Sequence, residues 1–355
     1  MKLPASCALA VLLLSASPLL CAEEAPAAPA PANAIDALTA DELDEVLALL
    51  REHYLAPAAL DDLEIKRATI QGLLSRLGSG AAILATDAAA KVVESPFRSE
   101  ILDQRIGYAR LGAVTDEHLA RLDGALDGFV AKNAGSVILD LRATPPGSDY
   151  ERAAEVCRRF TPKGKVLFSV KKPRIDEERV LTSKDDPKYR GLLVVLVDHD
   201  SAGSAEVIAA VLRTQARAMV IGQRTKGQAV EYADLPLPGG KVLHTAVAEV
   251  VLADAAPVFP GGLSPDLNVE VAQETTDAVL AGALEKGVGD YVFEVERAKM
   301  NEAALVAGTN PEIEAIQAAQ RKGPKARPLL RDVVLQRAVD FITTLGLAEK
   351  KPAVE

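Results

Sequence analysis

Residues 198–228 read DHDSAGSAEVIAAVLRTQARAMVIGQRTKGQ, and this stretch decides the fold. It follows LLVVLV at 192–197, an apolar and β-branched run that is typical of a strand buried on both faces. Small residues at 201–205 then predict a tight turn, and apolar residues recur at helical spacing from Val207 to Leu212. A second apolar run and a second polar turn follow. The pattern predicts strand, helix and strand, with both turns at one edge of a sheet.

A turn that joins a strand to a helix in this way is a frequent place for catalysis. It exposes one side chain at the sheet edge and directs backbone N–H groups at whatever binds there. Glu206 lies in the first turn of the predicted helix, where the helix dipole favours an acidic residue. We therefore expect the functional site beside the two turns.

Several motifs resemble those of the tail-specific proteases, also called C-terminal processing peptidases, which cut with a serine–lysine pair. Their order and spacing agree with the family over about half of the chain. The matching motifs are VILDLRATPPG at 137–147, DHDSAGSAE at 198–206, IGQRTKGQA at 221–229, the hairpin at 235–243 and GLSPD at 262–266. The resemblance implies an α/β fold of the crotonase-like (ClpP/crotonase) kind and an ancestry in serine-type proteolysis of protein C-termini.

The family's catalytic positions hold other residues in this chain. With the motifs aligned on Glu206, the nucleophilic serine falls on Gly203, the general-base lysine on Gln228 and a third family position on Tyr232. The interval from nucleophile to base, 228 − 203 = 25, is the one that the family keeps. Gly203 has no side chain to attack with, and Gln228 cannot accept a proton. The resemblance therefore implies that no family catalytic residue is intact.

A relocated pair, Ser204 and Lys226, remains an alternative. One residue along the start of a helix swings a side chain by about 100°, because a turn holds about 3.6 residues. We therefore favour a capping role for Ser204 and an exposed turn position for Lys226. Pro146 replaces the first glycine of the family's Asn-Pro-Gly-Gly motif, and proline has no N–H to offer an oxyanion.

The resemblance also implies a peptide-binding groove beside Gly147, Gly203 and Ser204. Strand addition needs backbone donors and a pocket but no nucleophile, so the groove can outlast the loss of catalysis. We expect extended polypeptide or a partner protein as its ligand, and a side chain introduced at position 203 to project into the groove without disturbing the fold. The favoured interpretation is a non-catalytic peptide-binding relative, and the alternative is an active serine peptidase with the Ser204/Lys226 dyad.

Composition excludes several other classes of function. The 355-residue chain has a formal net charge of −10 and a pI of about 5.1, which argues against nucleic-acid binding. Its four histidines lie at no metal-ligand spacing, so we predict neither a metal nor a cofactor. Cys157 is expected to pack in the core. The oligomeric state stays open.

The first residues predict export to the periplasm or the medium. Residues 1–22 read as a signal peptide cleaved after Ala22, and their apolar run is too short for a transmembrane anchor. Cys21 leaves a lipoprotein as an alternative, although Leu20 precedes it where a small residue is usual. Residues 23–34 form a Pro-Ala linker.

The remaining chain divides into four predicted parts. They are a helical hairpin at 35–78, a connector at 79–104 that is too short for the PDZ domain of most relatives, a protease-like core at 105–271 and a helical region at 272–355. Thr39 and Glu42 predict a capping box at the first helix. Asp140 and Arg142, at a strand end beside the groove, are predicted to pair for structural reasons.

Overall fold

The computed structural model describes residues 34–85, 95–253, 255–292 and 330–349. It divides into two units, residues 1–70 and 71–355, and the boundary falls within helix α2. The predicted signal peptide and nearly all of the linker lie outside the described residues. None of the helices in the described ranges is long and apolar enough to cross a bilayer.

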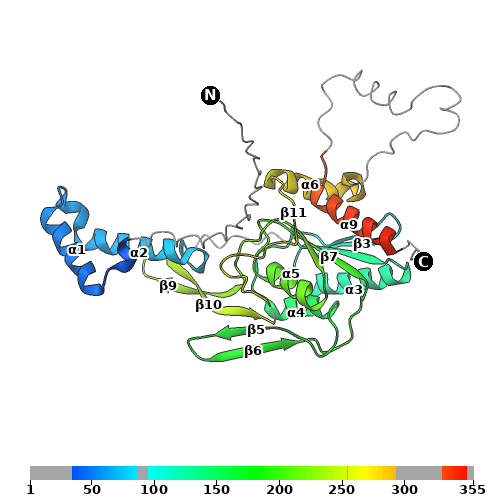
Figure 1. Cartoon of the computed structure of the whole chain (residues 1–355), viewed down its shortest axis with the longest axis horizontal. Helices are drawn as coiled ribbons and strands as arrows, with labels where there is room; N and C mark the ends of the chain where they lie inside the picture. Colours follow the sequence, from blue (N-terminus) through cyan, green and yellow to red (C-terminus); the bar gives the residue numbers. More distant parts are fainter. Residues whose placement is uncertain (1–33, 86–94, 254, 293–329, 350–355) are drawn as a thin grey trace, which may run out of the picture. The chain divides into compact units, whose positions relative to one another are not determined.

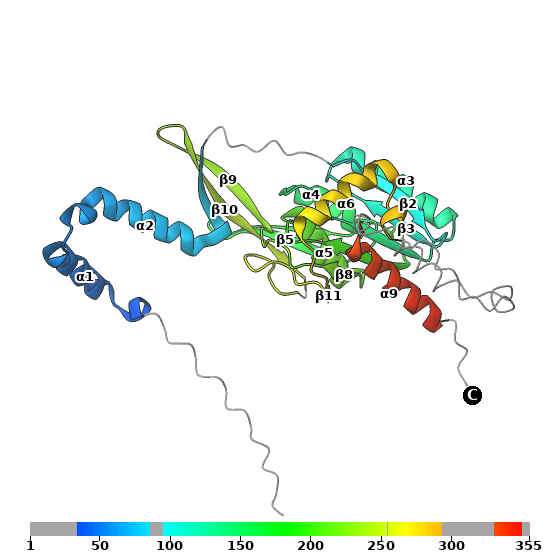
Figure 2. The same cartoon turned by 90° about the horizontal axis from the view of Figure 1, so that it is seen from above.

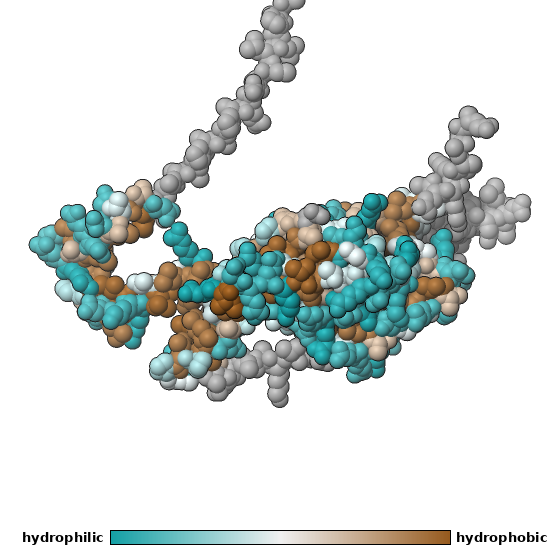
Figure 3. Space-filling view, turned by 90° about the horizontal axis from the view of Figure 1, so that it is seen from below, coloured by the Kyte–Doolittle hydropathy of each residue, from teal (hydrophilic) through white to brown (hydrophobic). Residues whose placement is uncertain are grey.

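The N-terminal helices form as the sequence predicts. They are α1 (Ala40–His53) and α2 (Asp62–Leu77). The capping box of α1 is present, with Thr39 and Glu42 each bonded to the other's backbone N–H. The apolar side chains of α1 stay exposed, for example Val46 at 41% and Leu50 at 42%, and apolar surface shows on these helices in Figure 3.

The larger unit is built on a mostly parallel sheet. Its strands in spatial order are β11 (Leu267–Asn268), β8 (Met219–Gly222), β7 (Leu192–Val197), β4 (Ser136–Asp140), β3 (Ile106–Arg110) and β2 (Arg98–Leu102). Only the edge pair of β2 with β3 is antiparallel. β7 lies between β4 and β8 and is almost wholly buried, so the predicted central position of the LLVVLV strand is confirmed.

Helices cover both faces of this sheet. The helices α3 (Asp116–Ala131), α4 (Tyr150–Arg158) and α5 (Ser204–Gln215) belong to one core, and α6 (Gln273–Lys286) and α9 (Val333–Glu349) to the other (Figure 1). Successive strand residues point to opposite faces, so Leu139 packs in the first core and Ile138 in the second. Cys157 is fully buried in the first core, as predicted.

A second, antiparallel sheet carries the hairpin that the motifs predicted. Its strands are β1 (Ala81–Ala85), β5 (Val166–Lys172), β6 (Glu177–Thr182), β9 (Val230–Leu237) and β10 (Lys241–Leu252). β10 pairs with β1 and β5 along one side and with β9 along the other. Figure 2 shows β9 and β10 as a long projecting hairpin.

The fold class agrees with the prediction, and two details differ. The α/β core with alternating strands and helices is confirmed. The predicted connector at 79–104 holds β1 and β2, which join different sheets. The predicted helical region at 272–355 is interrupted after α6, which ends at Lys286 before the positive-φ residue Gly287.

Candidate functional site

The turn after β7 and the turn after β8 meet, as the sequence predicts, and Glu206 joins them. Its carboxylate is fully buried and accepts N–H bonds from Gly203 at 2.9 Å, Gly227 at 2.6 Å and Gln228 at 2.7 Å, and it also accepts the Thr225 hydroxyl. Sequence reasoning assigned Glu206 only to the helix dipole. We call this set of bonds the Glu206 clamp. The sequence signal for it was an acid at the start of a helix, followed about twenty residues later by a polar turn that contains glycine.

Gly203 has the backbone of a strained strand-to-helix turn. Its φ of 58° and ψ of −116° lie outside the regions that residues with a side chain usually adopt. Asp198 shapes the turn by accepting the Ser201 N–H at 2.8 Å and the Ser201 hydroxyl at 2.8 Å. Burial raises the pKa of the Asp198 carboxyl, although these bonds to Ser201 oppose the shift. A turn of this geometry carries the nucleophile in many serine hydrolases.

The carbonyl oxygen of Gly147 occupies the space beside Gly203. A Cβ atom built on Gly203 would lie 2.2 Å from that oxygen, which is far inside van der Waals contact. The expectation that a side chain at 203 would project into the groove is therefore wrong, because the chain's own backbone fills the direction in which the Cβ must point.

The Gly147 carbonyl oxygen also accepts a backbone N–H at the start of helix α5. Ser204 donates its N–H to the Gly147 oxygen at 2.7 Å and its hydroxyl at 3.0 Å. In hydrolases with a nucleophile elbow, the N–H of the residue after the nucleophile is an oxyanion donor. In this chain the corresponding N–H, that of Ser204, is bonded internally.

The family positions Gly203, Gln228 and Tyr232 come together in one pocket. The pocket has a volume of about 350 Å³ and is lined by Pro146, Gly147, Ser148, Gly203, Gln228, Val230, Tyr232, Asp234 and His244. Three of these, Val230, Tyr232 and Asp234, alternate along β9, so they present one face of that strand. Tyr150 fixes the start of β9 by donating its hydroxyl to the Val230 carbonyl at 2.8 Å.

Ser204 and Lys226 are not among the residues that line this pocket. The Ser204 side chain is buried against Gly147, and the Lys226 amine lies 3.5 Å from an Asp200 carboxylate oxygen. In the described part of the chain, neither side chain bonds to the other. The capping role that we favoured for Ser204 is wrong, because Gly203 is the N-cap of α5 and Ser204 is its first residue, whose hydroxyl donates to the Gly147 carbonyl. Lys226 does lie at an exposed turn position, as predicted.

Tyr232 takes the third family position and is held at both ends of its side chain. Its hydroxyl donates to the Ser79 carbonyl at 2.8 Å, and its ring stacks on His244 with centroids 4.2 Å apart. Burial raises the pKa of the Tyr232 hydroxyl, and the nearby Glu206 charge raises it further. Tyr232 is therefore a neutral donor and a packing surface at neutral pH.

Asp140 and Arg142 form the predicted pair inside a larger buried network. Arg142 donates to both Asp140 and Asp332, with closest contacts of 2.7 Å to each, and Tyr108 donates to Asp140 at 2.7 Å. Burial favours the neutral acid, but the Arg142 guanidinium outweighs it and holds the pKa of Asp140 below its usual value. None of these side chains lines the pocket, so their role is structural.

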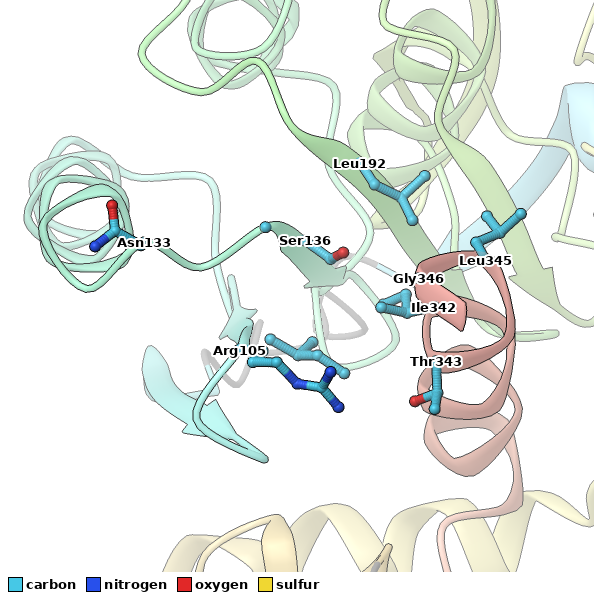
Figure 4. Close-up of a pocket in the computed structure, with 10 residues that line it drawn as sticks. Arg105, Asn133, Ser136, Leu192, Ile342, Thr343, Leu345 and Gly346 are labelled. Atoms are coloured by element: carbon cyan, nitrogen blue, oxygen red, sulfur yellow. The ribbon is translucent and has the colours of Figure 1, made fainter. Parts of the chain in front are cut away.

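A second pocket, of about 380 Å³, lies at the amino-terminal ends of the parallel strands (Figure 4). Ser136 and Leu192 begin their strands there and face Ile342 and Leu345 of α9. Arg105, the one cation among the described residues that line it, is paired with Asp103 at 2.7 Å. Among the described residues, no cluster of His, Cys, Asp or Glu could hold a metal ion.

Comparison with known proteins identifies the core. Residues 105–269 match peptidase family S41. The core of this chain is therefore similar to the peptidases of that family. The carboxy-terminal processing protease CtpA of Bacillus subtilis is 28% identical over 198 residues, which are 56% of this chain and 42% of that protein. The carboxyl-terminal-processing protease of Synechocystis sp. is 26% identical over 180 residues, 50% of this chain and 42% of that protein.

The matches cover only part of the length of these proteases. The matches span about two fifths of these two curated relatives, 42% of each. Among solved structures, the photosystem II D1 C-terminal processing protease has 21% identity and a TM-score of 0.42, and the match covers 54% of this chain and 47% of that one. The family match and the two curated relatives confirm the sequence resemblance to tail-specific proteases for the core.

Proposed function

We propose that this S41 relative binds extended polypeptide in the pocket beside Gly203 and does not cleave it. The observation that carries the proposal is the Gly147 carbonyl, which fills the place of a side chain at 203 and accepts the Ser204 N–H. A nucleophile and an oxyanion donor are both needed for acyl transfer, and this geometry leaves room for neither. Gln228 adds a third deficit, because an amide cannot act as the general base.

The edge of β9 supports peptide binding. Within the described residues β9 pairs with β10 alone, so its other edge offers unpaired backbone groups beside the pocket. An extended peptide can add to such an edge as a further strand, and side chains on alternate positions then reach the pocket. A partner protein that presents an extended segment would bind in the same way.

The second candidate function is an active peptidase that uses Ser204 and Lys226. The nearness of a serine and a lysine to the family positions is the observation that favours it. The contacts of both side chains oppose it, because the Ser204 hydroxyl bonds to Gly147 and the Lys226 amine to Asp200. Catalysis by this pair would require both bonds to break.

Export is part of the proposal. Residues 1–22 have the pattern of a signal peptide, and cleavage after Ala22 would leave Glu23 as the first residue of a periplasmic or secreted protein. The intact mass of protein recovered from the producing cell tests this. Retention of residues 1–22, or a lipid on Cys21, would contradict it.

Fluorescence anisotropy with a library of labelled peptides tests binding. Wild type is expected to bind extended peptides, and Ser148→Tyr is expected to weaken binding at least about tenfold, because the new ring would fill the pocket. Ser148 is exposed and lines the pocket. Ser99→Tyr, at an exposed position on β2, is the matched control and should bind as wild type does. Absence of peptide binding, or equal binding by both variants, would contradict the proposal.

A further inference from the structure

The pocket holds a histidine–carboxylate pair that the proposed function does not use. Asp234 on β9 and His244 on β10 are register partners in the hairpin. Directly opposite residues in an antiparallel pair lie on the same face, so their side chains meet. The Asp234 oxygen lies 2.6 Å from Nδ1 of His244.

This contact fixes which imidazole nitrogen can receive a ligand. An ionised carboxylate only accepts hydrogen bonds, so Nδ1 of His244 must donate to Asp234. In the neutral tautomer that carries its hydrogen on Nδ1, Nε2 is an acceptor. Stacking on Tyr232, with ring planes 16° apart, restrains the ring in this orientation.

The charge on the side chains that line the pocket is negative. Its lining, drawn from the described residues, includes no lysine or arginine, and Asp234 is its only carboxylate. The Asp234 side chain is 70% exposed, so one of its oxygens stays open to a ligand. The buried Glu206 carboxylate lies close enough to raise the pKa of Tyr232, so the field behind the pocket is also negative.

We propose that this pair selects peptides that place a lysine or arginine side chain in the pocket. The open Asp234 oxygen and Nε2 of His244 are acceptors on one face of the hairpin, and ammonium and guanidinium groups carry only donors. A peptide strand added to β9 would bring alternate side chains to this face. The inference rests on the proposed peptide binding and adds the chemical class of the ligand.

Binding of three matched peptides tests the selection. The peptides share one extended sequence and differ at a single central position, which holds arginine, glutamine or glutamate. Wild type is expected to bind the arginine peptide at least about tenfold more tightly than the glutamate peptide. Asp234→Asn should lose most of this preference, and Asp234→Lys should reverse it. His244→Ala should weaken binding of the arginine peptide more than binding of the glutamine peptide, because the acceptor Nε2 is lost.

One control variant separates this selection from attraction to an acidic protein. Asp186→Asn removes an exposed carboxylate from the segment that precedes β7. This segment leads into the amino-terminal end of β7, whereas the pocket lies beside the turn at its carboxyl end, so the substitution should leave the preference unchanged. Peptide binding without a charge preference, or a preference that survives Asp234→Asn, would overturn this inference and leave the proposed function standing. If no peptide binds, the proposed function and this inference both fail.

Discussion

The backbone N–H of Ser204 points at the carbonyl oxygen of Gly147, 2.7 Å away, beside Gly203, the residue that the sequence motifs align with the family's nucleophile. The bond joins the loop after β4 to the start of α5, two segments more than fifty residues apart. It also explains why position 203 is glycine, because any Cβ there would collide with the same oxygen.

Gly203→Ala should destabilise the protein by about 3 kcal/mol. The positive φ accounts for about 1–2 kcal/mol and the collision with Gly147 for about 1–3 kcal/mol. Gly164→Ala is the matched control, since Gly164 has a φ of +81° and nothing within 4 Å of its Cβ position. Urea unfolding measures both variants. Equal losses would show that the Gly147 carbonyl does not restrict position 203.

Glu206→Gln should cost about 2–4 kcal/mol in the free energy of unfolding. The buried carboxylate accepts bonds from four donors, and the amide of glutamine turns two hydrogens toward some of them. Glu117→Gln, at a side chain that is 71% exposed and paired only along its own helix, should change stability by less than about 0.5 kcal/mol. A loss in Glu206→Gln as small as that of the control would refute the clamp.

Tyr108→Phe should cost about 2 kcal/mol at neutral pH, because it removes a hydrogen bond to the ionised Asp140. That bond helps Arg142 to lower the pKa of Asp140, and a lowered folded-state pKa stabilises the protein above the unfolded value of about 3.9. The stabilisation is lost as the pH falls through the folded-state pKa. The cost of Tyr108→Phe should therefore shrink on acidification, as urea unfolding across the acid range would show. A cost that is constant with pH would contradict this role.

The sequence predicted the fold well because its signals are local. LLVVLV at 192–197 marks the central strand without reference to any other part of the chain. The capping box of Thr39 and Glu42 likewise marks the start of α1. The strands β1 and β2 were missed because their partners, β10 and β3, had to be known before the pairing could be recognised.

The candidate site was predicted in its positions but not in its contacts. Spacing alone aligned Gly203 and Gln228 with the family positions, and the structure brings both to one pocket. The direction of the Gly147 carbonyl depends on the path of a loop, and no pattern in the amino-acid sequence predicts it. The pairing of Asp234 with His244 depends on the register of a hairpin whose turn the sequence located but whose pairing it did not specify.

The central claim is that the elbow at Gly203 holds no working nucleophile, and covalent labelling tests it most directly. The purified protein is incubated with a fluorophosphonate probe, and intact mass is measured alongside a cleavage assay on an unfolded substrate with an apolar C-terminus. The account predicts no adduct and no cleavage. An adduct on Ser204, with cleavage that disappears in both Ser204→Ala and Lys226→Ala, would contradict it and establish the relocated dyad.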